Sequence, residues 1–205
     1  MAIKRKIDMQ GDVFEGISSV FLVKNGIVTT AAASTEGKDN GTEATIKDTD
    51  VVEAPVSNDS GFDFNGGTPS ISHFKIHGFN ADWASKFTPG DGEIKLEIPT
   101  EDSDVLDVVY GTEGTDVKLT LPDGVTVGGK NAVKGKARSF EQKAVYLGLL
   151  ILNDTEDKLL FIKKGKFIAT PAFDGGEKPY AITLTGTLAA GGDKDAYGIL
   201  EPVTA

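Results

Sequence analysis

The chain has 205 residues, of which 39% are hydrophobic and 25% are charged, and this composition predicts one globular domain over residues 1–205. Because the chain contains no cysteine, disulfide frameworks, thiolate metal sites and cysteine nucleophiles are excluded. The formal net charge of −10 argues against a protein that binds tightly to nucleic acid phosphates.

The N-terminal segment, residues 1–8, is basic at positions 4 to 6 but is not followed by the apolar run of a secretion signal. The longest apolar run, residues 144–152, is far shorter than the ~18 residues that a membrane span needs. We therefore expect a protein that is made in a cytoplasm and has no membrane among its partners.

Several segments alternate between apolar and polar residues, the period that buries one face of a strand. The pair Asn25-Gly26 is typical of a tight hairpin turn, and residues 163–166 are expected to form a longer connection of the same kind. Together with the high glycine content, this pattern predicts an all-β fold, an antiparallel β-sandwich or barrel of about nine or ten short strands. The expected strands lie within residues 17–23, 27–30, 73–77, 93–98, 117–121, 159–162, 167–169 and 180–188.

One short helix is expected at about residues 100–110. Thr100 can cap its start, and Gly111 can end it. The acidic residues of its first turn compensate the positive end of the helix dipole, so we assign no metal to them. Val105, Leu106 and Val109 share one face, and that face predicts a helix packed on the sheet.

Residues 34–66 carry eight acidic residues and only two basic ones, and they are predicted to form a long acidic loop. Loops of this length in a compact domain are usually functional or disordered. The segment retains six large apolar side chains, which indicate that it docks on another surface: Ile46, Val51, Val52, Val56, Phe62 and Phe64.

A basic stretch begins at Lys130 and could pair with an acidic partner surface. The preceding residues 124–130 resemble a phosphate-binding loop, but Asn131 stands where a serine or threonine would bind magnesium, so we interpret them as a glycine-rich turn. The basic residues expected to make contacts are Lys130, Lys134, Lys136 and Arg138.

The sequence contains no clear pattern of catalytic residues. His73 and His77 lie on a predicted strand, where residues four apart are separated by about 13 Å and cannot hold one ion together. No Gly-x-Ser-x-Gly motif is present. We expect no enzyme activity and assign no catalytic residue, cofactor or metal.

The stretch from Gly67 to Gly111 contains an alternating strand, a loop with Trp83, the strand 93–98 and the acidic-capped helix. This order resembles the central part of the family of bacteriophage tail tube proteins. Residues 166–188, with a glycine-rich turn at 174–176, are similar to its last strands. The first sixty residues have no counterpart in the resemblance.

The resemblance implies a β-sandwich that assembles with copies of itself into hexameric rings. Stacked rings would form a hollow virion tail tube that contacts other tail proteins, and DNA would pass through it without sequence-specific binding. Residues 34–66 would be the arm that orders on assembly.

Two other classes stay open. One is a different virion or assembly protein, such as a capsid decoration protein or a tail terminator. The other is a carbohydrate-binding or adhesive β-sandwich, in which Trp83 would stack on sugars, although a lone tryptophan more often anchors packing.

Overall fold

A computed structural model describes residues 16–31, 42–56, 61–75, 82–88, 90, 92–139, 141–173, 180–189 and 195–202. Eight strands form one antiparallel sheet in the order β4-β1-β11-β12-β13-β8-β5, with β14 also paired to β12. Three two-stranded pairs lie outside it. The sheet consists of β1 (Ser19–Lys24), β4 (Val51–Ala54), β5 (Phe62–Asn65), β8 (Glu93–Ile98), β11 (Ala144–Leu152), β12 (Leu159–Ala172), β13 (Ala181–Leu188) and β14 (Tyr197–Leu200).

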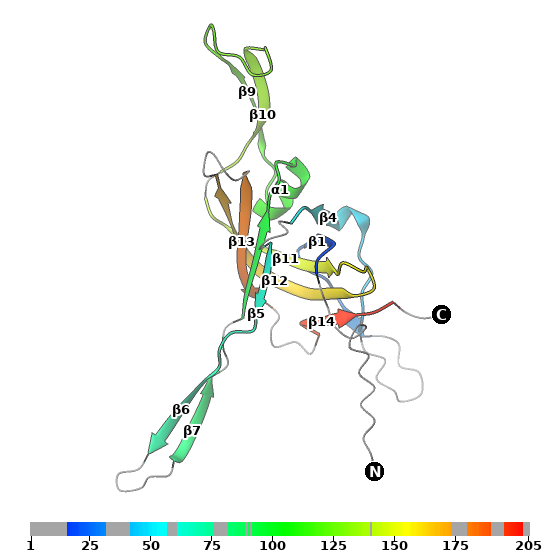
Figure 1. Ribbon diagram of the computed structural model, residues 1–205, viewed down its shortest axis with the longest axis vertical. Helices are drawn as coiled ribbons and strands as arrows, with labels where there is room; N and C mark the ends of the chain where they lie inside the picture. The colour runs from blue at the N-terminus through cyan, green and yellow to red at the C-terminus, as the bar shows by residue number, and fades with distance from the viewer. Residues whose placement is uncertain are drawn as a thin grey trace.

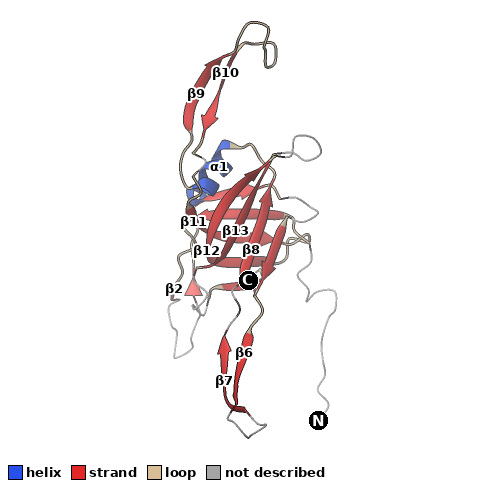
Figure 2. Cartoon of the chain, turned by 90° about the vertical axis from the view of Figure 1, so that its left-hand side faces the viewer, coloured by secondary structure: helices blue, strands red, loops and turns tan. Residues whose placement is uncertain are grey.

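The sheet folds over on itself around β12, its longest strand at 14 residues (Figures 1 and 2). The first part of β12 pairs with β14 and the second part with β13, while β11 runs along both. The register shifts between Leu147 and Leu149, opposite the middle of β12. A side chain at Gly165 or Gly186 would collide with the ring of Phe167, which is fully buried over both glycines. Glycine at these two positions therefore lets the aromatic ring fill the bend.

One hydrophobic core joins the two halves of the folded sheet. Ile94, Leu96 and Ile98 of β8 face the same cluster as Val20 and Leu22 of β1, and all five are fully buried. These residues occupy alternate positions, as the period of two requires. The prediction of an all-β fold with a single short helix is confirmed. The structure has 14 strands in its described residues, more than the nine or ten expected, because short edge strands and hairpins add to the main sheet.

The helix α1 (Ser103–Tyr110) covers one end of this core with Val105, Val108 and Val109. Its cap is Asp102, whose side chain accepts a hydrogen bond from the backbone N–H of Asp104, so the expectation that Thr100 is the cap is wrong. Thr100 instead accepts a hydrogen bond from the N–H of Asp102. Gly111 ends the helix at φ 66°, as expected.

The segment 34–66 differs from the single loop that its acidity suggested. Within its described residues lie the short helix η1 (Asp48–Asp50), β4 and β5. The strand β4 pairs with β1 at one edge of the sheet, and β5 pairs with β8 at the other. The acidic residues Glu53 and Asp63 point outward and alternate with apolar neighbours that are at least partly buried. The acidic composition of the segment therefore suggested a loop where the chain forms two half-buried edge strands.

Two predicted hairpin connections differ in the structure. Asn25 and Gly26 have the positive φ angles of a tight turn, 62° and 87°, but the chain does not return along β1. Ile27 instead donates its N–H to the carbonyl of Lys163, and β2 (Thr30–Ala31) pairs with β3 (Thr42–Glu43). Residues 163–166 are no connection, because they continue the curved strand β12.

Two long hairpins extend from opposite ends of the sheet (Figures 1 and 2). One consists of β6 (Ser70–Lys75) and β7 (Asp82–Thr88), and the other of β9 (Thr115–Thr120) and β10 (Ala132–Ala137). Neither belongs to the main sheet. The hairpins give the molecule its elongated shape and place their side chains away from the core.

Candidate assembly interface

The shaft of the β9–β10 hairpin has one apolar and one basic face. Leu119 lies opposite Val133, and Val117 lies opposite Gly135. Because directly opposed residues of an antiparallel pair point to the same side, these side chains share one face. Leu119 is 58% exposed, whereas Val117 and Val133 are half-buried, so the described part of the chain leaves this face uncovered at Leu119. On the other face, Lys118 lies opposite Lys134, Asp116 opposite Lys136 and Thr120 opposite Ala132.

The tip of this hairpin, residues 121–131, is an ordered double turn. The N–H of Val125 donates to the carbonyl of Pro122 at 3.1 Å. Val127 and Lys130 exchange two backbone hydrogen bonds of 2.9 and 3.1 Å around Gly128 and Gly129, both of which have positive φ. Val125 and Val127 are nevertheless half or more exposed, at 50% and 62%. The tip is thus preorganised and presents apolar side chains to its surroundings.

The base of the hairpin is fixed to α1 through the carboxylate of Asp107. Arg138 and Lys136 of the hairpin both pair with this carboxylate, Lys136 at 3.2 Å. Arg138 also donates to the carbonyls of Ser103 and Thr112, each at 3.2 Å. Burial alone would raise the pKa of Asp107, but the hydrogen bonds from Arg138 and Lys136 outweigh burial and lower the pKa. This cluster sets the direction in which the hairpin leaves the sheet.

The predicted basic contacts therefore divide into two pairs. The side chain of Arg138 is only 12% exposed and, with Lys136, it is used inside the subunit. Lys130 and Lys134 are exposed, and neither makes an ion pair with any residue that the structure describes. Of the four predicted basic contacts, Lys130 and Lys134 are the two whose charge is not paired with another described residue.

The predicted apolar contacts of the segment 34–66 have a partner within the same chain. Val52, Val56, Phe62 and Phe64 pack against the hydrophobic core, and Phe64 makes an edge-to-face contact with Tyr197 at 5.3 Å between ring centroids. Ile46 and Val51 are half-buried. These side chains belong mainly to the edge strands of the main sheet, which together with α1 we call the body. Their place in the sheet explains why an acidic segment retains them.

The β6–β7 hairpin has an exposed apolar pair of its own. Ile71 lies opposite Phe87, and both side chains are more than half exposed. His73 lies opposite Ser85 on the same face. The side chain of Trp83 and the whole of His77 lie outside the described residues, so the sugar-stacking and histidine hypotheses are not tested.

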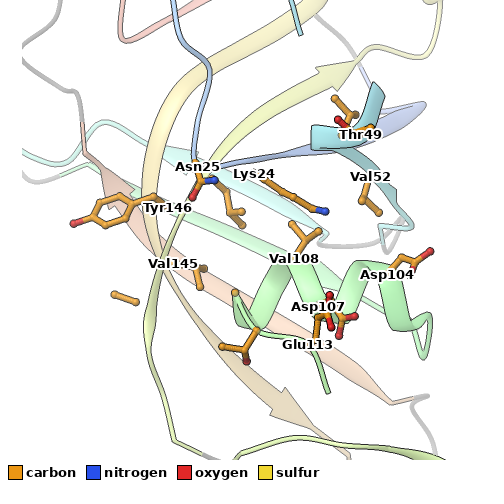
Figure 3. A pocket seen from close by; sticks show the side chains of 15 residues that line it. Lys24, Asn25, Thr49, Val52, Asp104, Asp107, Val108, Glu113, Val145 and Tyr146 are labelled. Atoms are coloured by element: carbon orange, nitrogen blue, oxygen red, sulfur yellow. The ribbon is translucent and has the colours of Figure 1, made fainter. Parts of the chain in front are cut away.

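A groove of about 680 Å³ lies beside α1 (Figure 3). We call it the α1 groove. Its two sides come from η1 and β4 on one hand and from α1 on the other, and Val52 and Val108 lie between them (Figure 3). The rim carries the exposed carboxylates of Asp104 and Glu113, whereas the side chain of Lys24 extends between Val52 and Val108 (Figure 3). The groove therefore combines two valines and one lysine between its sides with an acidic margin.

Sequence reasoning missed the most exposed apolar residues of both hairpins. A signal was present, because valine is unusual at the tip of a glycine-rich turn, where polar residues normally dominate. Val125 and Val127 could have been singled out on that ground. No comparable signal marks Ile71 or Phe87, whose alternation is the same as that of a strand with a buried face.

Within the described ranges, no cluster of three or more histidine, aspartate or glutamate side chains is suited to a metal ion. The same part of the chain contains no helix with the length and apolarity to cross a bilayer. Comparison with protein-family models and with curated proteins gives no match for this chain.

Proposed function

We propose that this chain is a structural virion subunit that assembles with copies of itself into rings, and that these rings stack into a tail tube. One observation carries the proposal. Two hairpins with exposed apolar pairs extend from opposite ends of a sheet that has its own complete core. Two-stranded hairpins are at best marginally stable alone, so such extensions are typical of segments that pack against another molecule.

The size of the hairpins favours an assembly with several contacts per subunit. A six-residue ribbon is about 20 Å long and offers roughly 200 Å² on one face. A stable pairwise interface needs about 800 Å² from each partner. No single hairpin face provides that area, whereas contacts at both ends and along the sheet edges β4 and β5 can act together.

The charge of the chain supports a conduit for DNA. Six subunits at −10 each would give a ring of about −60, which repels phosphate. A channel that must release its cargo benefits from such repulsion. The proposal also includes the remaining tail proteins as partners, assembly in the host cytoplasm and a final location in the virion tail.

The test is electron microscopy of the purified protein in negative stain over a range of concentrations, together with light scattering. We expect annular particles or hollow tubes and a mass far above the 21.6 kDa of one chain. A protein that stays monomeric at every concentration, or stops at a trimer without forming rings, would contradict the proposal.

A further inference from the structure

The tip of the β9–β10 hairpin combines three properties of a docking element. Its backbone is held in shape by internal hydrogen bonds, so little conformational freedom is lost on binding. Val125 and Val127 are exposed, and Lys130 beside them makes no ion pair within the described part of the chain. A matching surface must therefore be apolar in its centre and negative at its margin.

The α1 groove offers apolar side chains and a negative margin. Val52 and Val108 lie between its sides with the side chain of Lys24, and the exposed carboxylates of Asp104 and Glu113 stand on its rim (Figure 3). The neighbouring helix η1 carries two more acidic residues, Asp48 and Asp50, next to the groove residue Thr49. Asp107 also lines the groove, but its charge is already paired with Arg138 and Lys136.

The tip cannot reach the groove of its own chain. The hairpin extends away from α1, so its tip lies at the far end of the molecule (Figures 1 and 2). A contact between tip and groove therefore joins two copies. Since the two surfaces are different, each copy that uses its tip keeps a free groove, and the contact can propagate around a ring or along a filament.

We propose that the tip of one copy docks into the α1 groove of a second copy, with Val125 and Val127 against Val52 and Val108 and with Lys130 beside Glu113 and Asp104. This inference rests on the proposed function and names the contact by which neighbouring subunits recognise each other. The groove is then a receptor for a second copy of this chain, and the hairpin shaft sets the distance between the two bodies.

The absence of cysteine makes a direct test possible, since any disulfide must come from introduced residues. One variant carries Val127→Cys at the tip, and the other carries Thr112→Cys at the exposed rim of the groove. A disulfide requires Cα atoms within about 7 Å, so it reports a close contact. We expect a covalent dimer on a non-reducing gel when the two variants are mixed and oxidised. Thr120→Cys, on the polar face of the same hairpin shaft, is the matched control and is expected to give none with Thr112→Cys.

Charge reversal tests the same contact without a cross-link. Lys130→Glu and Glu113→Lys alone are each expected to raise the concentration needed for assembly at least tenfold, because like charges would then meet. Mixing the two variants restores opposite charges at every contact and is expected to restore assembly. Lys166→Glu, an exposed reversal on the body, makes the same change of net charge as Lys130→Glu and serves as the control for that variant.

The outcomes separate this inference from the proposed function. Wild-type tubes with neither the mixed disulfide nor the mutual rescue would overturn the docking of tip into groove while leaving the tube intact. A disulfide formed by the Val127→Cys variant alone would also overturn it, because that result requires tip to meet tip. A mixed disulfide in a protein that forms no rings would support the contact and contradict the tube.

Discussion

The strand β8 in the body and the strand β9 in the hairpin have the same alternating pattern and very different surroundings. Ile94 and Leu96 of β8 are fully buried between the two halves of the folded sheet. Leu119 of β9 occupies an equivalent position in its own pattern but is more than half exposed. Alternation therefore predicts a strand and an apolar face, whereas the covering of that face depends on what lies opposite it. In the body the cover is the same chain, and for the hairpin we infer a second copy.

The largest effect is expected where the body depends on a single large side chain. Phe167→Ala should lower the free energy of unfolding by about 3–5 kcal/mol, because the ring fills the space over Gly165 and Gly186 and its loss leaves a cavity. Urea unfolding followed by circular dichroism measures this change. A loss below about 1 kcal/mol would show that the two halves of the sheet do not share one tightly packed core.

A smaller effect is expected at the junction between body and hairpin. Asp107→Asn removes the charge that holds Arg138 and Lys136 and should cost about 1–3 kcal/mol. The N–H of Gly114 donates to the Asp107 carboxylate at 3.2 Å, so hydrogen exchange should become faster at Gly114 and in the first residues of the hairpin. Unchanged exchange there would contradict the role of Asp107 as the anchor.

The difference in the free energy of unfolding between wild type and Asp107→Asn should depend on pH. The pKa of Asp107 is lower in the folded protein than in the unfolded chain, so its contribution is complete above the unfolded value of about 3.9. That contribution is lost as the pH falls through the lower, folded value. The difference in stability between wild type and Asp107→Asn should therefore be constant near neutral pH and shrink below about pH 4. A difference that grows in acid would contradict this assignment.

The smallest effect on stability is expected on the exposed face of the hairpin. Leu119→Thr should change the free energy of unfolding by less than about 0.5 kcal/mol, because the side chain covers none of the core. If the face packs on a second copy, the same substitution should still weaken assembly. Thermal melting and light scattering on one sample separate the two effects, and a large loss of stability would show that the face is already covered within the subunit.

The all-β class, the helix near residues 103–110 and about half of the 14 described strands could be predicted because they depend on local patterns of two and of 3.6 residues. The edge strands β4 and β5 escaped prediction because each has only four residues and lies within an acidic segment. Lys163–Lys166 resembled a turn, although opposing strands hold it extended within β12. Long-range pairing decided both cases, and no local pattern encodes it.

The candidate interface was predictable in part. The basic stretch lies on the β9–β10 hairpin, but the sequence could not distinguish Lys130, which is exposed, from Arg138, which binds Asp107 across the junction. The six apolar residues of the segment 34–66 were predicted to contact a partner because burial within the same chain depends on long-range pairing. Four of them, Val52, Val56, Phe62 and Phe64, pack on the core. Deletion of this segment is therefore a poor test of assembly, because it would also remove two strands of the main sheet.

The order of the strands also sets the order in which a growing chain can fold. The strand β1 pairs with β11, and β8 pairs with β13, so strands made early must wait for partners that the ribosome delivers much later. Contacts so distant in sequence make folding slow. The β9–β10 hairpin, by contrast, has both of its strands and its anchor on α1 within residues 103–138, so it needs no partner that is made later in the chain. A nascent chain would thus display its docking tip before its own groove, built partly from β11, is complete, and it could be captured by a finished subunit while still being translated.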